Sequence, residues 1–171
     1  GNGPVAVSAI QTDAAGNQQT APAAAASFTL DTVAPRVTNV TSPVANGLYN
    51  AGQTIPVQVA FGEPVFVTGA PTLALNTTPA RFATYVSGSG TSTLTFNYVP
   101  RLGDVATRLD YASASALALN GGTIDDAAGN PATLALPAPG AAGSLGANKN
   151  IAVEASIVAT APALAGTRQP A

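Results

Sequence analysis

Residues 125–130 read DDAAGN, and residues 13–17 repeat the last five of them as DAAGN. Each copy lies between two runs of residues that are typical of strands. Asp and Asn side chains bond back to the nearby backbone and Gly supplies a positive φ, so each copy predicts a tight loop that joins two strands. The same residues bring several oxygens into a small volume, which a hard cation such as calcium requires. The repeated DAAGN sequence therefore indicates a chain built from repeated β units, with candidate metal ligands in their loops.

Apolar and polar residues alternate most clearly in residues 54–61 (TIPVQVAF) and 91–99 (TSTLTFNYV). This period of two predicts strands with one face buried and the other toward water. The sequence Gly62-Glu63-Pro64 is expected to end the first of them. Further strands are predicted at residues 37–41, 65–68, 72–76, 81–86, 123–124, 132–136 and 149–153 and in the second half of 110–120. Many short strands separated by turn signals indicate an all-β fold, an antiparallel β-sandwich.

A hinge at residues 31–35 (DTVAP) divides the chain, because Pro35 fixes its own φ and biases Ala34 toward an extended form. Residues 31–153 are expected to form one β-sandwich, since roughly 120 residues is a usual size for that fold.

The segments on either side of the expected sandwich differ from it. Residues 1–30, with strands predicted at 5–12 and 27–30, are expected to be the last two strands of a preceding, incomplete domain. Two strands alone are marginal, so we expect their apolar face to be covered by a neighbouring chain or to be poorly ordered. Residues 154–171 show no hydrophobic period and are predicted to be a linker or disordered tail.

Composition excludes several classes of function. Six Lys and Arg residues, eight Asp and Glu residues and a formal net charge of −2 disfavour nucleic acid as a partner, because no basic patch can neutralise a row of phosphates. The absence of His and Cys excludes Ser-His-Asp and thiol catalysis, so an enzyme is not expected, and it excludes disulfides. The sequence contains no run of about twenty apolar residues, so no membrane span is predicted. A secreted domain without disulfides needs another staple, and a bound metal is the usual substitute.

Five stretches carry a resemblance to a known family: DTVAPRVTNV (31–40), FGEPVFVTGAPTLALN (61–76), YVSGSGTSTLTFNY (85–98), LNGGTIDDAAGN (119–130) and LPAPGAAGSLGANKNI (136–151). In this order and spacing, the chain resembles the bacterial immunoglobulin-like (cadherin-like) repeats of large surface adhesins, and its opening piece resembles the end of a similar repeat. The resemblance implies tandem immunoglobulin-like sandwiches, secreted to the cell surface, that act as stalks or adhesion modules. Calcium at loops and domain junctions is common in such families.

An immunoglobulin-like topology predicts where the acidic residues meet. The entry to the first strand, the B–C connection and the F–G loop share one pole of such a sandwich, and they carry, in that order, Asp31, then Glu63, then Asp125, Asp126 and Asn130. Carboxylates that close repel one another and raise one another's pKa, and a cation relieves this repulsion. Calcium accepts the six to eight oxygens that carboxylates, backbone carbonyls and water supply, so we expect a calcium site at this pole.

Two further residues are weaker candidates, and an alternative applies to all of them. Asp13 and Asn17 form the same loop in the incomplete unit, where they lack the other acids as partners. The alternative is that Asp126 and Asn130 only cap a turn and that Glu63 is a solvated loop residue. Two other acids, Asp104 and Asp110, are expected at the opposite pole, where we interpret them as a loop residue and a residue at the start of a strand.

The expected function is structural: a repeat module that spaces and stiffens an extracellular bacterial surface protein or fibre, with calcium at the junction between units. Its partners are then neighbouring repeats or other subunits. One alternative is a module that binds a glycan or a host protein, which should show exposed aromatic and polar groups at the pole opposite the junction. A second is an accessory domain of a secreted hydrolase. A third is a filament-forming subunit that exchanges strands with its neighbours.

Overall fold

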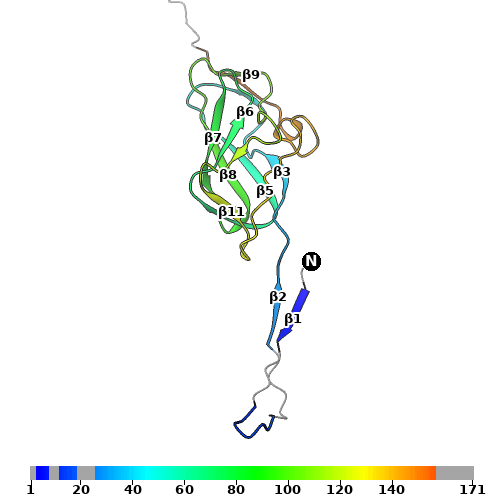
Figure 1. Cartoon of the computed structure of the whole chain (residues 1–171). Coiled ribbons are helices and arrows are strands. Elements are labelled where there is room, and N and C mark those ends of the chain that lie inside the picture. Colours follow the sequence, from blue (N-terminus) through cyan, green and yellow to red (C-terminus); the bar gives the residue numbers. More distant parts are fainter. Residues whose placement is uncertain (1–2, 8–11, 19–25, 157–171) are drawn as a thin grey trace, which may run out of the picture.

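The structure, a computed structural model, describes residues 3–7, 12–18 and 26–156. The described chain is all-β, and most of its strands pair antiparallel (Figure 1). The strands are β1 (Gly3–Val7), β2 (Ala26–Leu30), β3 (Val37–Thr41), β4 (Gly47–Tyr49), β5 (Ile55–Thr68), β6 (Thr72–Leu75), β7 (Arg81–Ser87), β8 (Thr91–Tyr98), β9 (Val105–Ala106), β10 (Leu117–Ala118), β11 (Thr123–Asp125) and β12 (Ile151–Glu154). One short helix of the described residues, α1, spans Leu145–Asn148.

Two sheets form the sandwich. The larger sheet has the order β10-β6-β7-β8-β5-β11, and β3 also pairs with β5. The smaller sheet has the order β4-β12-β9, in which β12 runs parallel to β4 and antiparallel to β9. Ile151 and Val153 of β12 belong to the same buried cluster as the core residues of β5 and β8, so the two sheets share one core. The predicted all-β sandwich is confirmed.

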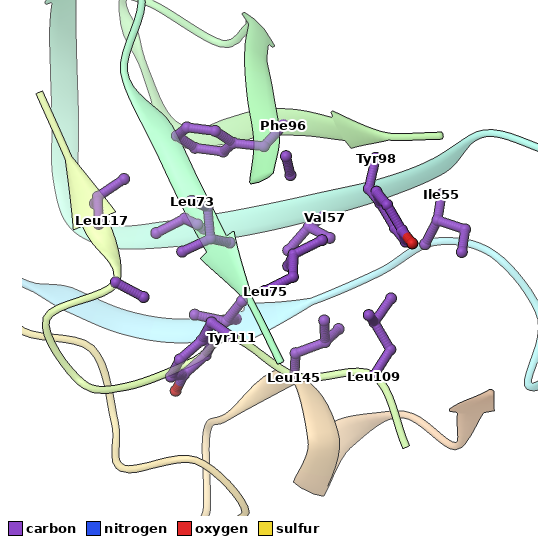
Figure 2. Close-up of a cluster of buried hydrophobic side chains, with 14 of the residues drawn as sticks. Ile55, Val57, Leu73, Leu75, Phe96, Tyr98, Leu109, Tyr111, Leu117 and Leu145 are labelled. Atoms are coloured by element: carbon purple, nitrogen blue, oxygen red, sulfur yellow. The ribbon is translucent and has the colours of Figure 1, made fainter. Parts of the chain in front are cut away.

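The alternation in β5 and β8 builds the centre of that core. Ile55 lies opposite Tyr98 and Val57 lies opposite Phe96, and all four side chains are buried (Figure 2). Burying one such side chain contributes roughly 1.5–3 kcal/mol. The residues between them, such as Gln58, are only half-buried, so the period of two in the sequence corresponds directly to the two faces of the sheet.

β5 corrects one prediction in a way that matters for the site. Gly62-Glu63-Pro64 does not end the strand, because β5 continues to Thr68. Its pairing with β8 shifts instead: Ala60 lies opposite Thr93, and the next pair is Val65 with Thr91. Five steps along β5 thus match two steps along β8, which is a β-bulge around Glu63. The residues on either side of Glu63 suit a bulge, because Gly62 has no side chain and Pro64 has no backbone N–H. Beyond it, β5 pairs with β11.

Other differences concern short elements. β4, β9 and α1 were not predicted, because each has only two to four residues and none of them belongs to a longer alternating run. α1 lies between the strands predicted at 132–136 and 149–153, and Ser144 caps it by accepting a hydrogen bond from the Ala147 N–H at 3.1 Å. The strand predicted at 132–136 is wrong: this segment forms only an isolated bridge, between Thr133 and Arg36.

β1 and β2 form a separate two-stranded sheet, in register from Gly3 opposite Leu30 to Val7 opposite Ala26. This sheet lies outside the sandwich and leads into it through the hinge at 31–35 (Figure 1). The first predicted strand, 5–12, starts earlier, at Gly3, and is described as far as Val7. Residues 8–11 of that prediction lie outside the described residues, as does most of the predicted tail at 154–171.

Asp104 is a loop residue as predicted, but it is fully buried. Its carboxylate accepts hydrogen bonds from Arg81 Nε at 2.8 Å, the Tyr98 hydroxyl at 3.0 Å and the Arg101 N–H at 2.9 Å. Burial by itself raises the pKa of Asp104, but these hydrogen bonds and the Arg81 charge outweigh it and hold the pKa below the usual 3.8. The same burial, together with the hydrogen bond to Asp104, raises the pKa of Tyr98.

Asp104→Ala is expected to lower the free energy of unfolding by about 3–5 kcal/mol, because three donors lose their acceptor. Chemical denaturation at neutral pH measures this, and Glu154→Ala, an exposed acid on β12, is the control, with an expected change below about 0.5 kcal/mol. Because the pKa is lowered by folding, the contribution of Asp104 is complete above about pH 3.8 and is lost as the pH falls further toward the folded pKa. Equal losses of unfolding free energy in the two variants would contradict a stabilising role for the buried Asp104 carboxylate.

Candidate metal site

The loop at residues 126–130 is held by its own side chains. Asp126 Oδ1 accepts hydrogen bonds from the N–H groups of Ala128 and Asn130, both at 2.8 Å, and Oδ2 accepts one from Asn130 Nδ2 at 2.7 Å. The Asp126 N–H donates to the Asn130 carbonyl at 3.1 Å, and Gly129 has φ 85°, which a residue with a side chain rarely adopts. The loop therefore needs Asp, Gly and Asn at these positions.

The loop at residues 13–17 has the same geometry. Asp13 Oδ1 accepts from the N–H groups of Ala15 and Asn17, both at 2.9 Å, Oδ2 accepts from Asn17 Nδ2 at 3.0 Å, and Gly16 has φ 87°. The Asn17 hydrogen bonds, first that of its side chain, lower the pKa of Asp13. The five residues form the same loop in two surroundings, so the predicted tight loops are confirmed, and the turn-capping role that formed the alternative is present in both.

Three of the predicted acids converge. One carboxylate oxygen each of Asp31, Glu63 and Asp126 lies within 4.8 Å of the others, and we call these residues the acidic cluster. Asp31 directly follows β2, Glu63 lies in the bulge of β5, and Asp126 begins the loop after β11. The bulge matters because it leaves Glu63 without a partner on β8, between the Ala60 and Val65 pairs and shortly before β5 meets β11. That these segments share one pole was predicted; their role as ligands stays a prediction.

Asn130 ties the hinge to the loop. Its Nδ2 donates both to Asp126 Oδ2 and to the backbone carbonyl of Asp31, the latter at 3.2 Å. Asp31 in turn accepts the Val33 N–H at 3.0 Å on Oδ1. The first residue of the hinge is thus bonded to a loop 99 residues away in the chain, on the side where its carboxylate joins the acidic cluster.

Of the remaining predicted residues, Asp125, Asp13 and Asn17 lie outside the acidic cluster. Asp125 is the last residue of β11, where it pairs with Phe66, and its carboxylate is not part of the acidic cluster. Asp13 and Asn17 lie in their own exposed loop. Asn130 adjoins the cluster through its Nδ2, which bonds to Asp126 and to the Asp31 carbonyl.

No positive charge balances the acidic cluster within the described part of the chain. Among the described residues, the ion pair is that between Arg81 and Asp104, outside the acidic cluster. The Glu63 side chain makes neither a hydrogen bond nor an ion pair with a described residue. Burial, and then the charges of Asp31 and Asp126, raise the pKa of Glu63 above its usual 4.5. For Asp126, burial acts in the same direction, but the hydrogen bonds from Asn130 and the loop N–H groups prevail and lower its pKa.

The acidic cluster has the donor chemistry of a calcium site. It offers carboxylate oxygens, and calcium takes oxygen ligands at about 2.3–2.6 Å. Two oxygens bound to one such ion lie no more than about 5 Å apart, so the separation of up to 4.8 Å fits a shared ion without a change of backbone. The half-buried carboxylate of Glu63, which no described donor satisfies, is the group that gains most from a cation.

No protein-family model, curated protein or solved structure matches this chain. Within the described ranges, no helix has the length and apolar character needed to cross a membrane. The function of the chain is therefore inferred from its own fold and side chains.

Glu63→Gln is expected to raise the melting temperature at neutral pH in the presence of a chelator. Folding raises the pKa of Glu63, so ionising this carboxyl costs stability, and the cost grows as the pH rises through 4.5 toward the folded pKa. Thermal melting near pH 4 and near pH 7 measures the difference, which should vanish at the lower pH. A variant that melts below the wild type at neutral pH contradicts the repulsion.

Proposed function

We propose that this chain is a structural repeat module of an extracellular bacterial surface protein or fibre, and that calcium stiffens the junction between its units. One observation carries the proposal: Asp31, the residue that joins the β1–β2 sheet to the sandwich, shares an acidic cluster with Glu63 and Asp126 of the sandwich. An ion held by all three residues would connect two parts of the chain that are otherwise joined by a short linker.

The hinge explains why an ion matters mechanically. Residues 32–34 lie between Asp31 and the buried Pro35, and their backbone dihedrals set the direction in which the preceding segment leaves the sandwich. Calcium takes six to eight oxygens in a site whose members must stay within a few ångströms of one another. Fixing Asp31 to Glu63 and Asp126 removes rotational freedom from the hinge, and this turns a flexible linker into a joint that transmits force.

The N-terminal segment supports a tandem arrangement. Its DAAGN loop has the hydrogen bonds and the glycine φ of the loop at 126–130, so two parts of this chain use the same local design. We assign the β1–β2 sheet to the end of a preceding unit and the sandwich to the following unit, both of immunoglobulin-like topology. Neighbouring repeats are then the principal partners of this chain.

Other features of the chain also suit a role outside the cell. Its sequence has no Cys and no His, and the buried polar groups of the described residues are satisfied without disulfides. Such a module needs no reducing or oxidising compartment to fold, and an ion that is abundant outside cells supplies the staple that a disulfide otherwise provides.

Calcium is expected to raise the melting temperature of the whole chain. At a free concentration of about ten times the dissociation constant, binding to the folded state adds about 1.4 kcal/mol, which corresponds to roughly 4–8 °C for a domain of this size. Scanning calorimetry in chelator and in increasing calcium measures this gain. A wild-type melting temperature that does not respond to calcium ends the proposal.

Two variants and a matched control locate the ion. Glu63→Gln should abolish the calcium gain, and it is the cleaner variant because Glu63 makes no hydrogen bond with a described residue. Asp126→Asn should also abolish it, although it additionally disturbs the loop. Asp13→Asn makes the same change in the same loop geometry, away from the acidic cluster, and should keep the gain. Retention of the gain in Glu63→Gln would place the ion elsewhere.

A further inference from the structure

The far end of the sandwich has a depression that the calcium junction does not use. Its volume is about 530 Å³, and it lies beside β7 and β8, where Thr84 is directly opposite Asn97. The lining residues are Ala80, Arg81, Phe82, Thr84, Asn97, Tyr98, Val99 and Arg101. Arg81 is bonded to Asp104 beside β9, at the end of the sandwich opposite β11 and the hinge (Figure 1).

Arg81 is held in place beside this depression. Its Nε donates to the fully buried Asp104, which is itself fixed by the Tyr98 hydroxyl and the Arg101 N–H. The side chain is 28% exposed, and its two terminal nitrogens donate to no residue in the described ranges. A guanidinium that is already oriented loses little conformational freedom when a ligand accepts its remaining N–H groups.

The other polar side chains of the lining have unused capacity. The side chains of Arg101, Asn97 and Thr84 make no hydrogen bond or ion pair with the described residues, and none of the eight lining residues is acidic. Two of the six cations of a chain with net charge −2 thus gather at one depression. The ligand that satisfies them has a negative group and several further acceptors and donors.

Phe82 adds an apolar contact surface. It is 59% exposed, and among the aromatic side chains that the structure describes only Phe66, at 47%, is comparably exposed. An exposed ring beside an amide, a hydroxyl and guanidinium groups matches the chemistry of a pyranose, which packs its C–H face on an aromatic ring while its hydroxyls bond to polar neighbours. We propose that this depression binds a sugar that carries a carboxylate, with Phe82 under the ring and Arg101 and Arg81 on the carboxylate.

The position of the depression argues against a peptide. β7 lies between β6 and β8, and β8 lies between β7 and β5, so neither strand offers an unpaired backbone edge for strand addition. A nucleic acid is also disfavoured as the ligand, since Asp104 neutralises Arg81 and leaves about one net positive charge at the depression. Recognition here has to use side chains on a sheet face, and this suits a compact sugar acid.

Binding to the intact chain tests the proposal. The probes are the methyl glycosides of glucuronic and galacturonic acid and of N-acetylneuraminic acid, with methyl glucoside and methyl galactoside as neutral counterparts. Titration followed by amide NMR should show saturable binding of at least one acid, with shifts at Thr84, Asn97 and Arg101, and at least about tenfold weaker binding of the neutral sugars. The absence of saturable binding by all three acids overturns the proposal.

Matched variants separate the two contacts. Arg101→Gln should weaken the acid about tenfold and leave the neutral sugar unchanged, whereas Phe82→Ala should weaken both. The controls are Arg108→Gln, an exposed arginine outside the depression, and Leu48→Ala, an equally exposed apolar residue on β4. Binding that survives both test variants, or a glutamate-rich peptide that binds independently of Phe82, overturns the sugar assignment.

The same titration in a chelator keeps this proposal distinct from the calcium junction. Arginine and phenylalanine need no metal, so binding of the sugar acid should persist without calcium. Binding that disappears with the chelator, or with Glu63→Gln, would place the sugar at the acidic cluster and overturn the site on β7 and β8.

Discussion

The pairing of β5 is the constraint on which the rest of the described sandwich depends. β5 pairs with β8, β3 and β11, more partners than any other strand in the described ranges. Apolar pairs such as Val57 with Phe96 bury its first half, and the bulge at Glu63 lets its second half turn to β11. One strand therefore builds the core and also delivers a carboxylate to the junction, so a change in its register would alter both at once.

The structure compensates the negative charges of Asp104 and Glu63 to different degrees. Asp104 is fully buried, but Arg81, Tyr98 and a backbone N–H supply all the donors that it needs. Glu63 is less buried, yet its neighbours are two further carboxylates and no described donor compensates it. The first arrangement stabilises the fold by itself. The second leaves a repulsion at neutral pH, and the proposed calcium ion would relieve it.

The two ends of the sandwich consequently have opposite chemistry. Carboxylates gather where the hinge enters, and arginines with an exposed aromatic ring gather at the end that carries β9. The β-sandwich between them separates the two groups, so each can be altered without the other. Under the two proposals above, the chain would be joined to a neighbouring unit at one end and would bind a sugar acid near the other.

What the sequence by itself determined are the features that depend on neighbours a few residues apart. Alternation predicted β8 and the first half of β5. The two DAAGN loops form the same internal hydrogen bonds, because every partner in those bonds lies within four residues. The meeting of Asp31, Glu63 and Asp126 followed once a sandwich was assumed. Only the tertiary structure decided that β5 continues through a bulge, that Asp104 is a buried anchor and that Asp125 is not in the acidic cluster. These outcomes depend on pairing registers and on partners from distant strands, about which the residues next to each position carry no information.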